Sequence, residues 1–340
     1  MSTINRAFWQ DKIEVPSVIR EGTIPSKLED DQVLIKVHAW GMNPVDGFLQ
    51  HFALPFLKYP LIPGEDIAGT IERVGAGAAS QHFQVGDRVF GYAHGAFQEH
   101  VAIDHVLAVK VPDSMTFPEA AVFPLCFATA AHALFAADYL HMPFPKLGGA
   151  APAAGKSVLI WGGAAGVGSN AIQLAKAAGY SVVTTCSARN FDYVKSLGAD
   201  KAFDYNSASI IDDLVAELDT GVCAGIFQAA GPQGAVGPCC QVAYKSKQTL
   251  FVACANAVPE GEVPEGVVAK FVYDANPKGF YYDTCAVLFR EFLPQALATG
   301  EYQIAPKPEV VNTRGVEGIQ EALDILKKGV SAKKIIVEAK

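Results

Sequence analysis

A short apolar strand that runs directly into a glycine-rich turn and then a helix constrains this chain more than any other feature of its sequence. Residues 157–161 (SVLIW) form a continuous apolar run of strand length, and glycines follow at 162, 163, 166 and 168. The helix expected from about residue 167 to 178 presents its free N–H groups and the positive end of its dipole to this turn. Because such a helix terminus binds pyrophosphate, the pattern predicts a dinucleotide site.

The turn itself carries the predicted cofactor contacts. The G-x-G-x-x-G register of dinucleotide-binding turns is met at its first and last positions, whereas alanine stands at its middle position. Glycine lets the backbone approach the phosphates and lets the helix pack closely on the strand. A purely structural glycine turn is the alternative. The predicted contacts are Gly163, Ala164, Ala165, Gly166, Val167 and Gly168.

The second strand of this unit, expected at residues 181–186, indicates which dinucleotide is bound. NAD sites usually place an acid about 20 residues after the glycines, where it binds the ribose 2′-hydroxyl. Residues 184–190 (TTCSARN) contain no acid and instead offer Ser187 and Arg189, which suit a 2′-phosphate. We therefore predict NADPH as the cofactor; the alternative is that Arg189 only begins the next helix in solvent.

The chain shows two patterns of expected secondary structure. Its first third reads as short strands separated by turns, which indicates a β-rich barrel or sandwich. From about residue 156, strands alternate with helices, which indicates right-handed crossovers and a parallel sheet. The last predicted strand, 334–338, returns to the β-rich unit, so the fold class is α/β with one unit inserted into the other. The strands expected in the first third are residues 32–39, 68–74, 88–92, 96–102 and 106–111. Further helices are expected at 119–139, 191–197, 280–298 and 316–328, and further strands at 201–203, 225–228 and 249–253.

Composition excludes several classes of function. The 340 residues are 50% hydrophobic and 18% charged, with a formal net charge of −8, so the chain has no overall attraction to nucleic acid or anionic membrane. The longest apolar run, 121–137, is near the lower limit for a membrane span of about 17–25 residues and contains Pro124 and His132. We expect a buried core helix there.

The cysteines and the N-terminus favour an intracellular protein. The seven cysteines are odd in number and contain no C-x-x-C spacing, so neither a disulfide framework nor a zinc knuckle is predicted. Residues 1–11 have no apolar signal core. We expect a cytoplasmic protein.

Short motifs in both parts of the chain resemble the medium-chain dehydrogenase/reductase superfamily, and the resemblance covers nearly the whole chain. It implies a GroES-like β-rich barrel domain, residues 1–126 and 276–340, plus a Rossmann domain with a doubly wound parallel sheet, residues 127–275. Within the superfamily the chain is similar to zinc-independent quinone oxidoreductases and fungal trans-acting enoyl reductases. The motifs are 41–46 (GMNPVD), 63–69 (PGEDIAG), 85–89 (VGDRV), 178–179 (AG) and 197–200 (LGAD), together with 161–163 (WGG), 203–205 (FDY) and the Gly/Pro-rich stretch 143–155.

The resemblance also implies that no metal is bound. Zinc-dependent members carry a Cys in the region of Asn43, a His-Glu pair after the glycine that matches Gly64, and a later Cys. This chain has Met-Asn-Pro at the first place and Glu65-Asp66 at the second. Cys126 lies near the third place, but the register set by Thr129 puts a leucine there. These residues do not supply the three ligands that catalytic zinc requires.

Three residues are catalytic candidates by resemblance. Asn43 lies at the start of a helix beside the substrate, where it either hydrogen-bonds a carbonyl or caps the helix. Thr129 falls where the family places a threonine near the nicotinamide; helix packing is its alternative role. Related quinone reductases have a Tyr near Phe48, which this chain lacks, so His51 is the candidate proton donor, with a plain surface role as its alternative.

The remaining cofactor candidates follow later strands. Tyr205 matches a position near the adenosine or the 2′-phosphate. Ala253 and Asn256 belong to a loop that leaves the carboxyl end of a sheet strand, where dinucleotides bind. Lys333 and Lys334 are both expected near the cofactor, with a solvated basic pair as the alternative.

These observations predict an NADPH-dependent, zinc-independent oxidoreductase that reduces quinones or α,β-unsaturated carbonyls of a small-molecule substrate. One alternative is a trans-acting enoyl reductase on carrier-bound thioesters, with an acyl-carrier or polyketide synthase partner. Others are a non-catalytic NADPH-binding protein and a zinc alcohol dehydrogenase. The resemblance implies a monomer or a homodimer.

Overall fold

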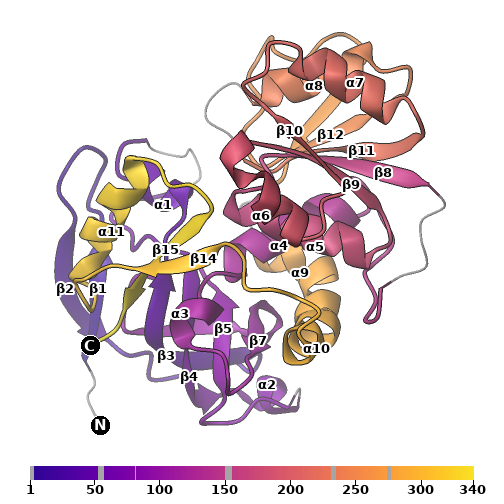
Figure 1. The fold of residues 1–340 in the computed structure, drawn as a ribbon. Helices are drawn as coiled ribbons and strands as arrows, with labels where there is room; N and C mark the ends of the chain where they lie inside the picture. The colour runs from indigo at the N-terminus through magenta and orange to yellow at the C-terminus, as the bar shows by residue number, and fades with distance from the viewer. Residues whose placement is uncertain (1–3, 53–56, 81, 150–154, 231–234, 274–276) are drawn as a thin grey trace. The chain divides into compact units, whose positions relative to one another are not determined.

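The computed structural model describes residues 4–52, 57–80, 82–149, 155–230, 235–273 and 277–340 (Figure 1). The chain forms two compact units, residues 1–125 with 304–340 and residues 126–303. The first unit is therefore built from both ends of the chain.

The first unit is built on an antiparallel sheet. Its strand order is β14-β15-β3-β4-β5-β7, and β6 pairs with β3; the single parallel pair within it is β14–β15. A separate two-stranded ribbon joins β1 and β2, which the sequence pattern did not predict because every residue of β2 is exposed and no apolar alternation marks it. The strands are β1 (Ile4–Trp9), β2 (Val18–Thr23), β3 (Gln32–Gly41), β4 (Asp66–Val74), β5 (Arg88–Tyr92), β6 (His100–Asp104), β7 (Ala108–Lys110), β14 (Lys307–Val310) and β15 (Lys333–Glu338).

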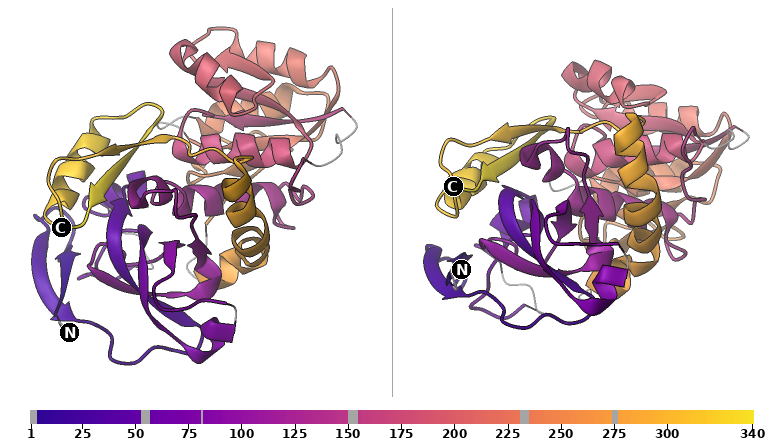
Figure 2. Two further views of the ribbon diagram at one scale, coloured as in Figure 1. Left: turned by 60° about the horizontal axis from the view of Figure 1, so that its bottom comes forward. Right: turned by 90° about the horizontal axis from the view of Figure 1, so that it is seen from below.

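The core of this unit lies under β3. Trp40 on β3 is fully buried, and its indole N–H is shared between the carbonyls of Ala96 and Gln98 at 3.0 and 3.2 Å. The C-terminal strand β15 pairs antiparallel with β3, so the yellow end of the chain lies against its indigo beginning (Figure 2). The helices are α1 (Pro44–Phe48), α2 (Ala76–Ser80), the 3₁₀ turn η1 (His105–Leu107), α3 (Phe117–Ala120) and α11 (Gly318–Lys327).

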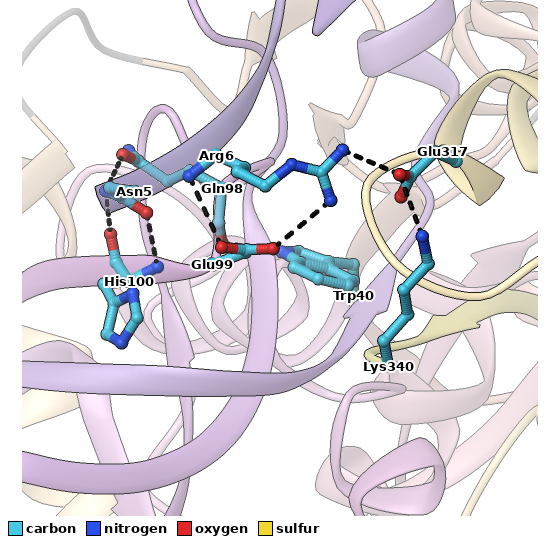
Figure 3. A network of polar contacts seen from close by, with 8 residues as sticks. All are labelled: Asn5, Arg6, Trp40, Gln98, Glu99, His100, Glu317 and Lys340. Carbon is cyan, nitrogen blue, oxygen red and sulfur yellow. Dashed lines mark hydrogen bonds and ion pairs between the residues drawn. The ribbon is translucent and has the colours of Figure 1, made fainter. Parts of the chain in front are cut away.

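An ion-pair network ties the two ends of the first unit together (Figure 3). Arg6 on β1 lies 2.7 Å from Glu317 Oε1 and 3.7 Å from Glu99 Oε1. Glu317, at the N-cap of α11, also accepts from Lys340 at 2.9 Å. The network therefore links the first strand to the last helix and the last residue.

The second unit contains a six-stranded parallel sheet. Its order, β10-β9-β8-β11-β12-β13, is that of a doubly wound dinucleotide-binding sheet. From β8 the chain adds β9 and β10 toward one edge of the sheet, and it then returns to add β11, β12 and β13 toward the other edge. The strands read as apolar runs because helices cover both faces of a parallel sheet. The strands are β8 (Lys156–Trp161), β9 (Ser181–Cys186), β10 (Lys201–Asp204), β11 (Val222–Gln228), β12 (Phe251–Cys254) and β13 (Val268–Phe271).

Helices pack on each face of this sheet. Helices α5 and α6 lie on one face of the sheet, and α7 and α8 pack against each other on the opposite face (Figure 1). The helices are α5 (Gly166–Ala177), the 3₁₀ turn η2 (Ala188–Asn190), α6 (Phe191–Ser196), α7 (Ile210–Leu218) and α8 (Val236–Lys245), with α9 (Pro277–Val287), the π segment η3 (Leu288–Phe292) and α10 (Leu293–Thr299) near the end of the unit. The structure groups α9 and α10 with the second unit, whereas the resemblance led us to expect residues 276–340 in the first.

The apolar run of residues 121–137 lies mainly in α4 (Pro124–Phe135). The stretch Phe117–Phe135 is long and apolar enough to cross a membrane, but 78% of its most apolar window is buried inside the protein, as in a core helix. The expected single helix 119–139 is interrupted before Pro124, where proline starts a new helix because it has no N–H to continue the previous one.

Candidate functional site

The glycine turn after β8 is built so that larger residues do not fit. A Cβ added to Gly163 would lie 2.2 Å from Thr184 Oγ1, and one added to Gly168 would lie 2.2 Å from the carbonyl oxygen of Gly162. Gly162 itself has a φ of +88°, which favours glycine. The turn can therefore hold the start of α5 close against β8 and β9, as the sequence predicts.

The N-terminus of α5 is open to an anion. Its N-cap residue is Ala165, which has no side-chain oxygen, and no side-chain cap is found there among the described residues. The N–H of Ser169 donates to Ala165 O at 2.8 Å, which is the first hydrogen bond of the helical pattern. The backbone N–H groups before Ser169 lie in the first turn, where the helix itself supplies no acceptor. Predicted contacts Gly166 and Val167 supply these groups, and Ala164 lies in the turn before them.

The carboxyl ends of β9 and β10 bring together the residues predicted to select NADPH. Parallel pairing sets Cys186 beside Asp204, so the following residues are neighbours. The hydroxyls of Ser187 and Tyr205 lie 2.7 Å apart. Arg189 is exposed in η2, and among the described residues nothing hydrogen-bonds or ion-pairs with its guanidinium group.

A buried glutamine that sequence reasoning missed fixes the next loop. Gln228, fully buried at the end of β11, donates from Nε2 to Asn256 Oδ1 at 2.8 Å and accepts from the Asn256 N–H at 3.2 Å. The predicted contact Asn256 is thus oriented from the neighbouring strand. Ala253 is fully buried in β12, so any contact it makes is through its backbone. In the sequence, Gln228 could have been noticed as a polar residue that directly follows an apolar strand segment.

Thr129 lies on α4 and is buried. One turn further on, His132 packs against Phe280 with ring centroids 3.8 Å apart. Burial lowers the pKa of His132 to about 4, so this imidazole is neutral at pH 7. The helix face that carries Thr129 therefore bears no charge from this histidine.

A buried polar cluster in the first unit surrounds the catalytic candidate Asn43. The Lys334 ammonium lies 2.6 Å from Asp66 Oδ2 and 2.5 Å from Asn43 Oδ1, and Asn43 Nδ2 donates to the same Asp66 oxygen at 2.8 Å. Asp66 Oδ1 accepts from the backbone N–H of Leu125 at 2.7 Å. Both ends of the Asn43 amide are thereby held, which favours its positioning role over its role as a free donor.

Lys333 and Lys334 point in opposite directions because consecutive strand residues alternate faces. Lys334 is buried, with a side chain only 5% exposed, whereas Lys333 is exposed and forms an ion pair with Glu309. Both lysines are predicted cofactor contacts. The structure places Lys334 in the polar cluster and Lys333 at the surface.

Two further carboxyl groups belong to this cluster. Asp46 Oδ2 accepts from the Asn43 N–H at 2.7 Å, which caps the start of α1. Burial raises the pKa of Asp46 to about 8. Burial and the nearby charges of Asp46 and Asp66 raise the pKa of Glu65 well above its usual value.

His51 makes its contacts elsewhere on the first unit. Its Nδ1 lies 2.9 Å from Glu14 Oε1 and its Nε2 lies 3.2 Å from the Lys327 ammonium. Its side chain is partly exposed. The structure therefore places this predicted proton donor in a surface network rather than with Asn43.

The polar cluster does not fit a catalytic zinc ion. Asn43 and Asp66 are bound to an ammonium group, and the backbone N–H of Leu125 binds the second oxygen of Asp66. Over the described ranges of the chain, no group of three or more His, Cys, Asp or Glu side chains is placed to hold a metal ion. Catalytic zinc needs three such ligands and an open position.

A doubly wound sheet with a glycine turn, joined in one chain to an antiparallel β unit, defines the class of dinucleotide-dependent dehydrogenases and reductases. The alcohol dehydrogenase GroES-like domain model matches residues 29–113, and the zinc-binding dehydrogenase model matches residues 166–268. The chain belongs to the medium-chain dehydrogenase/reductase superfamily of oxidoreductases, so the predicted family and fold class are confirmed.

Individual relatives agree with this assignment. The chain is 42% identical over 337 residues to "Dehydrogenase orf1" of Aspergillus niger, covering 94% of each chain. It is 37% identical over 347 residues to "Trans-enoyl reductase himH" of Aspergillus japonicus, covering 99% of this chain and 98% of the relative. The solved structure of mycobacterial Rv1454c complexed with NADPH shares the fold, with a TM-score of 0.73 and 23% identity over 98% of this chain and 99% of that one.

Proposed function

We propose that this oxidoreductase uses NADPH to reduce α,β-unsaturated carbonyl compounds or quinones without a metal ion. The observation that carries the proposal is the buried contact of Lys334 with Asn43 and Asp66. The Lys334 ammonium group occupies the oxygen atoms of Asn43 and Asp66, which a metal-dependent mechanism would need as ligands. Reduction of a conjugated double bond needs a hydride donor and a proton donor, and requires no Lewis acid.

Three residues support the choice of NADPH. Arg189 is exposed and without a partner among the described residues, so its guanidinium group is available to a 2′-phosphate. The hydroxyl pair of Ser187 and Tyr205 supplies further donors at the same sheet edge. The NADPH complex described for a protein of the same fold adds support.

When bound, the nicotinamide supplies the hydride chemistry. The α5 terminus binds the pyrophosphate, and Gln228 holds Asn256 toward the carboxyl end of the sheet. In the first unit, Asn43 is a positioning residue: its hydrogen bonds hold the start of α1 next to Asp66.

The test is NADPH oxidation with a panel of quinones, enals and acyl thioesters, with and without a chelator. We expect turnover of at least one class, preference for NADPH over NADH, and no effect of the chelator. Loss of activity with the chelator would contradict the metal-free mechanism. Binding of NADPH without turnover of any class would favour a non-catalytic binding protein.

A second candidate is reduction of enoyl thioesters carried by an acyl-carrier or polyketide synthase partner. The 37% identity to a protein named as a trans-enoyl reductase favours it. The same enoyl group is presented on a carrier protein and as a small free thioester. A kcat/KM at least about tenfold higher for the carrier-bound form, worth about 1.4 kcal/mol, would support this candidate; equal values would reject it.

A further inference from the structure

Glu65 and Asp46 are the members of the buried polar cluster that each have one carboxyl oxygen buried without a hydrogen-bond partner among the described residues. The side chain of Glu65 is 14% exposed, and its unpartnered atom is Oε2. The hydroxyl of Tyr92 hydrogen-bonds the carboxyl group, and Nδ1 of His94 lies 3.8 Å from Oε1. An ionised carboxylate in this place would lack the partners that a buried charge needs.

The charges around Glu65 also favour its protonated form. Asp46, Glu65 and Asp66 interact electrostatically with one another and with the single ammonium of Lys334. That ammonium forms an ion pair with Asp66 at 2.6 Å. The carboxyl groups therefore outnumber the positive charge, and burial disfavours a second unpaired negative charge.

Access separates Glu65 from Asp46, the other carboxyl group with a raised pKa. Asp46 is fully buried, and its Oδ2 is used to cap α1. Glu65 keeps an exposed edge, and beside it the side chain of His94 is 49% exposed. Nδ1 of His94 lies 3.8 Å from Oε1 of Glu65, so an exposed imidazole is close to the carboxyl group. The exposed edge of Glu65 lets solvent return a proton to it.

We propose that Glu65 is the proton donor of this reductase: it transfers its carboxylic acid proton to the substrate carbon next to the carbonyl group. This inference rests on the proposed function. Hydride addition to the β-carbon moves the electron pair of the C=C bond onto the carbonyl system and gives an enolate. The O–H bond of Glu65 breaks, a C–H bond forms at the α-carbon, and the electron pair stays on the carboxylate. Water then reprotonates Glu65 through its exposed edge.

Glu65→Gln tests the proposal because it keeps the size of the side chain but removes the acidic proton. With a turned-over enal and saturating NADPH, we expect kcat to fall on the order of 100-fold or more, as for loss of a general acid. The dissociation constant for NADPH should stay within about twofold. The decline of wild-type kcat at high pH should be absent from the variant. Glu72→Gln, which changes a carboxylate paired with His100 on the same unit, is the matched control and should leave kcat unchanged.

Infrared difference spectroscopy gives a readout that needs no substrate. Wild type minus Glu65→Gln at pH 7 should show the C=O stretch of a protonated carboxylic acid, shifted in D₂O. If Glu65→Gln does not fold, Glu65→Asp replaces it; the shorter acid should keep part of the activity and the declining pH limb.

The outcomes are distinct. A normal kcat and pH profile in Glu65→Gln, or an infrared spectrum with only a carboxylate band, would overturn the proposal. If wild type reduces none of the substrate panel, the proposed function fails, and the infrared band then decides the protonation state by itself.

Discussion

The Lys334 ammonium and the Asp66 carboxylate lie 2.6 Å apart with both side chains removed from solvent. Removing one charge from such a pair leaves the other buried without compensation. The pair joins β15 to the start of β4, so its loss acts on the sheet of the first unit as well as on Asn43.

Lys334→Met should therefore lower the free energy of unfolding by about 3–5 kcal/mol. Asp66→Asn in the same background removes the stranded charge and should recover part of this loss, because the remaining groups are neutral. Urea unfolding of both single variants and the double variant measures the effect. Strictly additive losses would show that the two groups do not interact.

Arg189→Ala should weaken NADPH binding by about 10- to 100-fold, which corresponds to loss of a hydrogen bond to a charged group. NADH binding should change little because NADH has no 2′-phosphate. Fluorescence titration with both cofactors measures the difference. Arg290→Ala, at another exposed arginine of the second unit, is the control. Equal weakening of both cofactors would contradict the role given to Arg189.

Gly168→Ala should disrupt the turn, because the added Cβ would lie 2.2 Å from the backbone oxygen of Gly162. Overpacking of this kind costs about 1–3 kcal/mol, and the displaced N-terminus of α5 should bind NADPH more weakly. Gly221→Ala is the control, since its Cβ would meet nothing closer than 3.4 Å. Thermal unfolding and NADPH titration are the measurements; a Gly168→Ala protein with wild-type values for both would refute the close packing.

Glu317 gives a pH-dependent contribution to stability. Its hydrogen bonds to Arg6 and Lys340 lower its pKa to about 2 (Figure 3). A carboxyl group with a lowered pKa stabilises the fold above its unfolded pKa of about 4.3, and this contribution is lost as the pH falls toward 2. Because the pair is about one-third exposed, screening limits the effect to about 1 kcal/mol or less.

Urea unfolding should accordingly show Glu317→Gln to be less stable than wild type at pH 7. The two proteins should converge as the pH approaches 2. Glu260→Gln, on the second unit, serves as the control. A difference that stays constant from pH 7 to pH 2 would show that the ionised form of Glu317 is not what stabilises the fold.

Residues with strong local patterns were predictable from the sequence. The run 157–161, its glycines and the following helix gave the turn and the parallel sheet, since each of these depends on neighbours in the chain. Strands β13 and β14 and the β1–β2 ribbon were missed. Val268–Phe271 is a short edge strand, and the exposed β2 has no apolar face to produce an alternating pattern.

The polar cluster shows what local reasoning cannot supply. The motif around Asn43 was found by resemblance, but its contact with Lys334 joins residues 291 positions apart. Strand alternation requires that only one of the two adjacent lysines point inward, yet it does not say which one. The sheet register, with Ile336 opposite Gly41, decides it by turning Lys334 toward Asp66.

The split first unit has a consequence for how the protein is made. Asp66 is synthesised 268 residues before its counter-ion, and the entire second unit emerges between them. Until Lys334 is synthesised, the first unit therefore contains Asp66 without this counter-ion. It also lacks β15, the strand that pairs with β3. Because domains tend to fold as they emerge, the continuous second unit can fold first, while the first waits for the final residues of the chain.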